Sequence, residues 1–97
     1  MERSRVAKLL GEHRAYLRHE FGVTRLALFG STSRDEAEPR SDVDVLVEFE
    51  GRTTAKGYFG VLAYLEDLLG VEVDLATQAM IRPELRSRIE RDLRDVA

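Results

Sequence analysis

The segment DVDVLVEF, residues 42–49, constrains the fold of this 97-residue chain more than any other. Side chains two positions apart on a strand point to the same face, about 6.6 Å from each other. Three valines at alternate positions claim one face for the core: Val43, Val45 and Val47. Asp42 and Asp44 then project together from the opposite face. The segment therefore predicts a strand whose buried side fixes the direction of two carboxylates.

A second strand is predicted at VEVDLAT, residues 71–77, which also alternates. Its apolar residues Val71, Val73 and Leu75 share one face, and this leaves Glu72 and Asp74 on the other. If the two strands are neighbours in a sheet, Asp74 completes a cluster of three carboxylates with those of the preceding strand.

Such a cluster has an electrostatic cost. Two like charges about 6 Å apart repel by roughly 3 kcal/mol at an effective dielectric constant of 20. Divalent cations, arginines, raised pKa values or full exposure to water would offset it. Carboxylates without a neighbouring histidine or cysteine suit a hard ion such as Mg²⁺. A strand that simply turns polar residues to solvent would give the same pattern for Asp42 and Asp44 without a metal.

A Gly-Ser pair, Gly30 and Ser31, follows a short predicted strand at residues 25–29. Glycine permits unusual backbone angles and lets a phosphate approach closely, and the serine with the amides that follow supplies hydrogen-bond donors. A phosphate site and an ordinary turn are both consistent with this pair.

The remaining pattern is largely helical. Apolar spacing predicts helices at residues 2–20, at 58–69 and from Pro83 onward, the last with its apolar positions one turn apart: Leu85, Ile89, Leu93 and Val96. Ser33 and Glu36 have the spacing of a cap for a short helix that Pro39 would help to end. This order predicts an α/β (α+β) fold, a small mixed β-sheet covered by helices, in one domain over residues 1–97.

Composition excludes several classes of protein. No apolar run approaches the roughly 18 residues of a membrane span. A net charge of −3 disfavours direct nucleic-acid binding, which draws its affinity from clustered Lys and Arg. The chain has no cysteine, and its first residues lack the apolar core of a signal peptide, so a cytoplasmic location is expected.

The stretch GSTSRDEAEPRSDVD resembles the Gly-Ser-x-x-Arg and Ser-Asp-x-Asp signature of the minimal nucleotidyltransferase (MNT) family, a branch of the DNA polymerase beta-like nucleotidyltransferase superfamily. The tripeptide VDL at residues 73–75 supplies the third acid of that family. The resemblance implies the polymerase beta-like fold and a Mg²⁺-dependent transfer of AMP, or another nucleoside monophosphate, from a nucleoside triphosphate to a hydroxyl. ATP is the substrate that the relatives suggest.

By the same resemblance, the catalytic acids Asp42, Asp44 and Asp74 would ligate two Mg²⁺ ions. The implied nucleotide-binding residues are Gly30, Ser31, Arg34 and Ser41, with Arg34 facing a phosphate or pairing with an acid. Two residues depart from the family pattern, since Asp35 stands where relatives commonly have Gly, and Arg40 where many carry an acidic or amide residue.

Many members of this family are antitoxins that inactivate a HEPN-domain ribonuclease toxin by adding AMP to one of its tyrosines, and this is the biological role expected here. Two alternatives stay open. One is a binding module of the MNT fold that neutralises its partner by occlusion, without catalysis. The other is a nucleotidyltransferase that acts on a small molecule or an RNA end. The sequence leaves the base preference and the oligomeric state, including a homo-oligomer, open.

Overall fold

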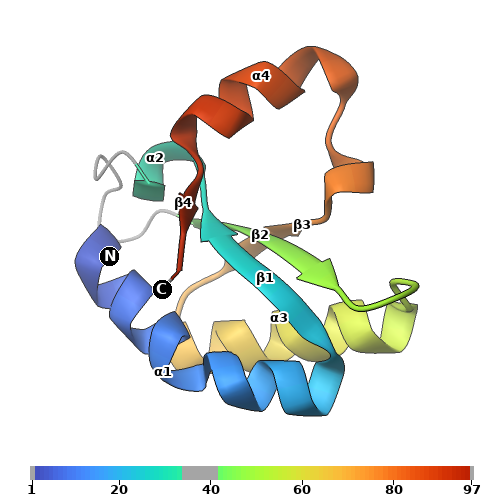
Figure 1. Cartoon of the computed structure of the whole chain (residues 1–97). Coiled ribbons are helices and arrows are strands. Elements are labelled where there is room, and N and C mark those ends of the chain that lie inside the picture. Colours follow the sequence, from blue (N-terminus) through green and yellow to red (C-terminus); the bar gives the residue numbers. More distant parts are fainter. Residues whose placement is uncertain (1, 34–41, 97) are drawn as a thin grey trace.

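The computed structural model describes residues 2–33 and 42–96 (Figure 1). In chain order the elements are α1 (Arg3–Phe21), β1 (Val23–Leu28), α2 (Gly30–Ser33), β2 (Val43–Phe49), α3 (Ala55–Leu69), β3 (Val73–Ala76), the 3-10 turn η1 (Gln78–Met80), α4 (Pro83–Asp92) and β4 (Arg94–Asp95).

The strands form one mixed sheet in the order β3-β2-β1-β4. β1 runs antiparallel to both β2 and β4, whereas β3 runs parallel to β2. A parallel pair needs a crossover connection, and α3 provides it. The predicted small mixed sheet with a helical crossover between its acid-bearing strands is confirmed.

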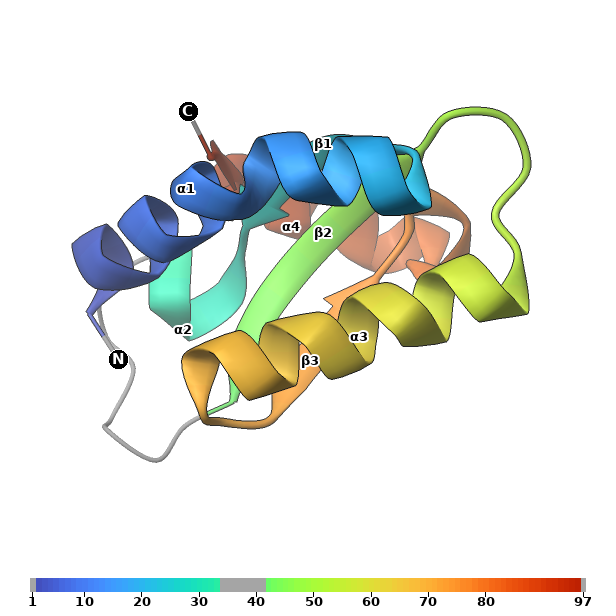
Figure 2. The ribbon, with the colours of Figure 1, turned by 90° about the horizontal axis from the view of Figure 1, so that it is seen from below.

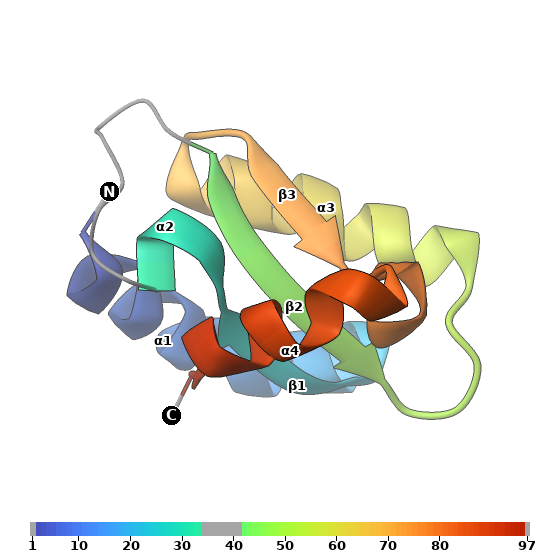
Figure 3. The same ribbon diagram turned by 90° about the horizontal axis from the view of Figure 1, so that it is seen from above.

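Helices cover the two faces of this sheet unequally. α1 and α3 lie side by side under one face (Figures 1 and 2), while α2 and α4 lie over the other (Figure 3). The larger core cluster lies on the α1 and α3 side and includes the three alternate valines of β2. A smaller cluster on the α4 side is built around three buried side chains: Ala27, Leu46 and Ile81. β2 is therefore buried on both of its faces in its middle, while Asp44 at one end and Glu48 and Phe49 at the other are only partly buried.

Apolar spacing and caps explain the two long helices. α1 buries Val6, Leu10 and Leu17, and the helix ends at Gly22. α3 begins after Thr54, whose hydroxyl accepts a hydrogen bond from the Gly57 amide at 3.0 Å. None of the helices in the described ranges is long and apolar enough to cross a membrane.

The end of the chain differs from the prediction. The last helix stops at Asp92, and the chain then turns into β4, which pairs with Ala27 and Leu28 of β1. The prediction that Leu93 and Val96 continue the helix was therefore wrong. Val96 instead joins the larger core cluster, and its amide donates a hydrogen bond to the Leu26 carbonyl at 2.9 Å.

Other boundaries differ as well: β1 covers residues 23–28 and not the predicted 25–29, and α3 begins at Ala55 and not at residue 58. β3 covers only residues 73–76 of the predicted 71–77, since the preceding residues connect it to the end of α3. Ser33 ends the short helix α2 rather than beginning one, because its hydroxyl donates a hydrogen bond back to the Gly30 carbonyl at 2.9 Å. Glu36 and Pro39, the other parts of that predicted helix, lie outside the described residues.

Candidate active site

Two of the predicted acids lie directly opposite each other in the sheet. Asp44 on β2 is paired with Asp74 on β3 in the parallel register, so both occupy the same face. The Val43 amide donates a hydrogen bond to the Glu72 carbonyl at 3.1 Å and fixes this register where the strands begin. The predicted adjacency of the two acid-bearing strands is confirmed.

The third acid, Asp42, lies two residues before Asp44, where the chain enters β2. Asp42 and Asp74 are exposed, and Asp44 is partly buried. In the described ranges, no three acidic, histidine or cysteine side chains converge closely enough to hold a metal ion. The structure brings the three aspartates to one end of the β2–β3 pair, and their role as metal ligands stays a prediction.

Gly30 lies against the carboxylate of Asp44. Its φ is +65°, and a Cβ placed on it would overlap the Asp44 Oδ2 atom and lie 3.1 Å from Cγ. The neighbouring Phe29 amide donates a hydrogen bond to the Asp44 carbonyl oxygen at 3.2 Å. Only glycine provides both this backbone conformation and this close approach. The Gly-Ser turn and Asp44 therefore form one structural unit.

Two residues that the sequence did not indicate as part of the site, Ser33 and Arg3, support this turn. Ser33 is a buried polar side chain, 1% exposed, and its hydroxyl bonds to the carbonyl of Gly30. Arg3, at the start of α1, donates a hydrogen bond from Nη1 to the Ser33 carbonyl at 2.9 Å. The turn is thus connected to the first helix as well as to β2.

The outer side of β3 is held by α3. Glu66 accepts a hydrogen bond from the Val73 amide at 3.0 Å, and the Tyr58 hydroxyl donates one to the Leu75 carbonyl at 2.5 Å. Burial raises the pKa of the Tyr58 hydroxyl, and the negative charge of Asp74 raises it further. These two bonds lie on either side of Asp74 in the chain.

Of the remaining predicted nucleotide-binding residues, only Ser31 lies in the described ranges. Ser31 lies in α2, directly after Gly30. Arg34 and Ser41 lie outside the described residues, as do Asp35 and Arg40.

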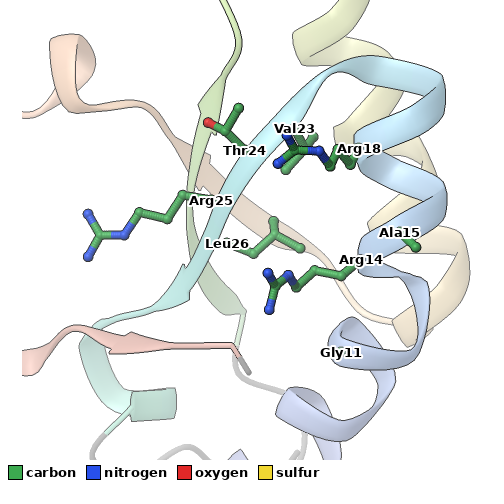
Figure 4. A pocket seen from close by; sticks show the side chains of 8 residues that line it. All are labelled: Gly11, Arg14, Ala15, Arg18, Val23, Thr24, Arg25 and Leu26. Atoms are coloured by element: carbon green, nitrogen blue, oxygen red, sulfur yellow. The ribbon is translucent and has the colours of Figure 1, made fainter.

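A separate cavity lies between α1 and β1, with a volume of about 310 Å³ (Figure 4). It is lined by Gly11, Arg14, Ala15, Arg18, Val23, Thr24, Arg25 and Leu26. Arg25 is neutralised from two sides, by Asp95 at 2.7 Å and by Glu48 at 2.9 Å. None of the predicted site residues lines this cavity, and the acids lie instead at the far end of β2.

The residues present fit a hard divalent cation. The donor set is carboxylate oxygen, and the missing side chain of Gly30 lets the Gly-Ser turn and the Asp44 carboxylate approach each other closely. Asp74 occupies the facing position on the next strand. This arrangement suits chemistry on phosphate groups, in which oxygen-bound cations neutralise the charge of a substrate.

Comparison with known proteins identifies the class of this fold and site. Residues 10–96 match the protein family described as the nucleotidyltransferase domain. The chain belongs to this family, and the prediction that it is a nucleotidyltransferase enzyme is confirmed.

Relatives over almost the whole chain place it more narrowly. MJ0128 of Methanocaldococcus jannaschii, a proposed protein adenylyltransferase, is 37% identical over 93% of both chains. The protein adenylyltransferase MntA of Thermococcus cleftensis is 35% identical over 91% of this chain and 89% of its own. The predicted resemblance to minimal nucleotidyltransferases is confirmed.

Two solved structures have a similar fold. A proposed minimal nucleotidyltransferase superposes with a TM-score of 0.80 at 33% identity, covering 97% of this chain and 95% of its own. The second is a complex of a tri-AMPylated HEPN toxin of Shewanella oneidensis with its MNT antitoxin. The matched chain of that complex has a TM-score of 0.65 at 17% identity, covering 94% of this chain and 71% of its own, which shows the fold alone.

Proposed function

We propose that this chain transfers AMP from ATP to a tyrosine hydroxyl of a HEPN-domain toxin and thereby acts as its antitoxin. The observation that carries the proposal is the pairing of Asp44 with Asp74 in register, directly beside the Gly30 turn. Carboxylates next to a turn without a side chain are what a site for a metal-bound nucleoside triphosphate needs.

Asp42, Asp44 and Asp74 would hold Mg²⁺, which when bound neutralises the triphosphate and polarises its phosphorus–oxygen bonds. Gly30, which has no side chain, would let a phosphate approach the turn closely, and Ser31, the next residue in the chain, would supply a hydrogen-bond donor. The acceptor oxygen attacks the α-phosphorus, and the bond from that phosphorus to the bridging oxygen breaks. Pyrophosphate leaves with the bonding electrons, and the exposed Asp74 carboxylate accepts the proton of the acceptor hydroxyl.

Two findings support a protein acceptor. The relatives MJ0128 and MntA, similar over nearly their whole length, are named as protein adenylyltransferases. In addition, Asp42 and Asp74 are exposed, so the acids are accessible to a large acceptor. The AMP-modified HEPN toxin in the structurally similar complex supports the choice of toxin.

The test combines the purified chain, a HEPN-domain toxin, ATP and Mg²⁺, and mass spectrometry of the toxin detects added AMP. We expect AMP on a toxin tyrosine with the wild-type chain and none with Asp42→Asn, while thermal unfolding shows that the variant is folded. Glu72→Gln, which removes an exposed carboxylate of the same strand region, serves as the control and should retain transfer.

Two results would contradict the proposal. Inhibition of the toxin by Asp42→Asn as strong as by the wild type would indicate occlusion by a binding module. Transfer to an aminoglycoside or an RNA end, with none to the toxin, would assign a different acceptor to the same site.

A further inference from the structure

β3 is an edge strand, and its peptide groups point alternately toward β2 and away from the sheet. The Glu72 carbonyl accepts a hydrogen bond from the Val43 amide of β2, so residues 72, 74 and 76 direct their peptide groups to β2. The peptide groups of Val73 and Leu75 therefore point outward. These two residues are the immediate neighbours of Asp74 in the chain.

Side chains of α3 bind one outward group from each of these residues. Glu66 accepts from the Val73 amide, and Tyr58 donates to the Leu75 carbonyl. The two side chains are eight residues apart, which is close to two helical turns, so they lie on one side of α3. The views from below and from above both show α3 running beside β3 (Figures 2 and 3).

We infer that Tyr58 and Glu66 are positioning residues that hold Asp74 in register with Asp44. This inference rests on the proposed function, because that function requires Asp74, the acid that the two residues would hold in place. β3 has only four residues and a partner strand on one side alone, so the two bonds from α3 add to the restraint that β2 and the buried side chains of Val73 and Leu75 provide. A short edge strand that exchanges these two bonds for water shifts or frays, and the carboxylate moves with it.

The helix that provides the two side chains is itself well anchored. α3 buries Val61, Leu65 and Leu69 in the main core, and Thr54 caps its first turn. Tyr58 and Glu66 therefore connect the edge strand to a helix that is fixed in the core. Their hydrogen bonds also occupy outward-facing backbone groups of β3 with which another strand could otherwise pair.

Two variants remove one bond each while keeping most of the side chain. Tyr58→Phe deletes the hydroxyl, and Glu66→Met deletes the acceptor but keeps an unbranched chain of similar length. Glu66→Gln keeps an acceptor oxygen and should rescue the function. Tyr16→Phe is the matched control, because Tyr16 is an exposed tyrosine on α1 whose hydroxyl has no hydrogen-bond partner among the described residues.

Amide hydrogen exchange measures the bonds directly. We expect faster exchange of the Val73 amide in Glu66→Met and normal exchange in Glu66→Gln. In steady-state transfer to the toxin, Tyr58→Phe and Glu66→Met should lower kcat about 10-fold, the lower end of the range for residues that orient ligating groups, with an unchanged KM for ATP. The Mg²⁺ concentration that gives half-maximal rate should rise, and Tyr16→Phe should match the wild type in every readout.

A double-mutant cycle separates positioning from general stability. In an Asp74→Asn background, Tyr58→Phe should cause no further loss of transfer, because it acts through the missing carboxylate. Full additivity of the two losses, or wild-type kcat in both single variants, would overturn the inference while leaving the proposed function intact. Full transfer by Asp74→Asn alone, or none by the wild type, would overturn the proposed function, and the inference with it.

Discussion

The α-carbon of Gly30 lies so close to the Asp44 carboxylate that no side chain fits between them. A Cβ at this position would overlap Oδ2 and lie 3.5 Å from the Asp44 Cβ, and the backbone there has a φ of +65°. The turn follows β1 and begins α2, whereas the acid lies on β2, and the two depend on each other sterically.

Gly30→Ala should therefore abolish transfer without unfolding the protein. The left-handed backbone costs about 1–2 kcal/mol of folding free energy in any residue with a Cβ. Gly51→Ala is the matched control, because Gly51 has a φ of +69° and no atom near its missing Cβ. We expect similar losses of unfolding free energy in urea for both variants, but a drop in transfer of at least about 100-fold only for Gly30→Ala. Equal transfer by the two variants would contradict this account.

Asp74→Asn should lower transfer to the toxin by about 100-fold or more, with little change in stability. Asp74 is exposed, so the substitution removes charge without disturbing the core. Glu72→Gln removes the neighbouring exposed acid that precedes β3, and its rate should stay within about 2-fold of the wild type. The transfer rates are measured at saturating Mg²⁺ and ATP. They show whether transfer needs the Asp74 carboxylate itself or only negative charge in this region, and similar losses in both variants would favour the second explanation.

Leu46→Ala should destabilise the domain strongly. Leu46 is fully buried on β2 beneath α4, and removing a buried leucine side chain typically costs about 2–5 kcal/mol of unfolding free energy. Leu85 on α4 is 42% exposed, so Leu85→Ala should lower the free energy of unfolding by less than about 1 kcal/mol. Urea unfolding followed by circular dichroism compares the two, and similar midpoints would show that α4 does not cover Leu46 in solution.

The ion pair between Arg25 and Asp95 predicts a pH dependence. The Arg25 guanidinium, through its hydrogen bond, holds the pKa of the Asp95 carboxyl below its ordinary value of 3.8. A lowered pKa in the folded state stabilises the protein above pH 3.8, and this contribution is lost as the pH falls through the folded-state value.

Asp95→Asn should accordingly be slightly less stable than the wild type at pH 7. The difference should be under about 1 kcal/mol, because the Asp95 side chain is 64% exposed and the pair is screened by water. Thermal unfolding from pH 7 to pH 3 should show a constant gap between the two proteins well above pH 3.8 and a narrowing gap once the pH falls below that value. A gap as large at pH 3 as at pH 7, or one that is unaffected by 1 M salt, would show that the pair is not its source.

Alternation made β2 predictable. Its valines are apolar at every second position, and the structure begins and ends this strand at the predicted residues 43 and 49. The same argument applied to Asp74 predicted the facing acid, because a parallel neighbour in register repeats the same alternation. The sequence predicted that Gly30 permits the close approach of another group. It did not predict that this group is the Asp44 carboxylate, since their contact depends on how β1 and β2 align.

The sequence could not predict β4 or the support of β3. Leu93 and Val96 have helical spacing, but the chain buries Val96 in the opposite layer and must leave the helix to reach it. Tyr58 and Glu66 belong to an amphipathic helix in which a polar side chain normally faces water, and only the position of the edge strand shows what they bind. The spacing of two helical turns between them was the one available signal.

The burial of β2 on both faces limits how this site can evolve. A one-residue shift of the strand would turn Val43 and Val45 to the face that now carries Asp44 and would turn Asp44 into the core, so the acids cannot move without loss of the fold. Residues 50–54, which follow β2, and 82–88, which begin α4, are exposed and carry no such constraint. Surface residues around the site can therefore change, and with them the acceptor of the proposed reaction, while the strand that carries the acids stays the same.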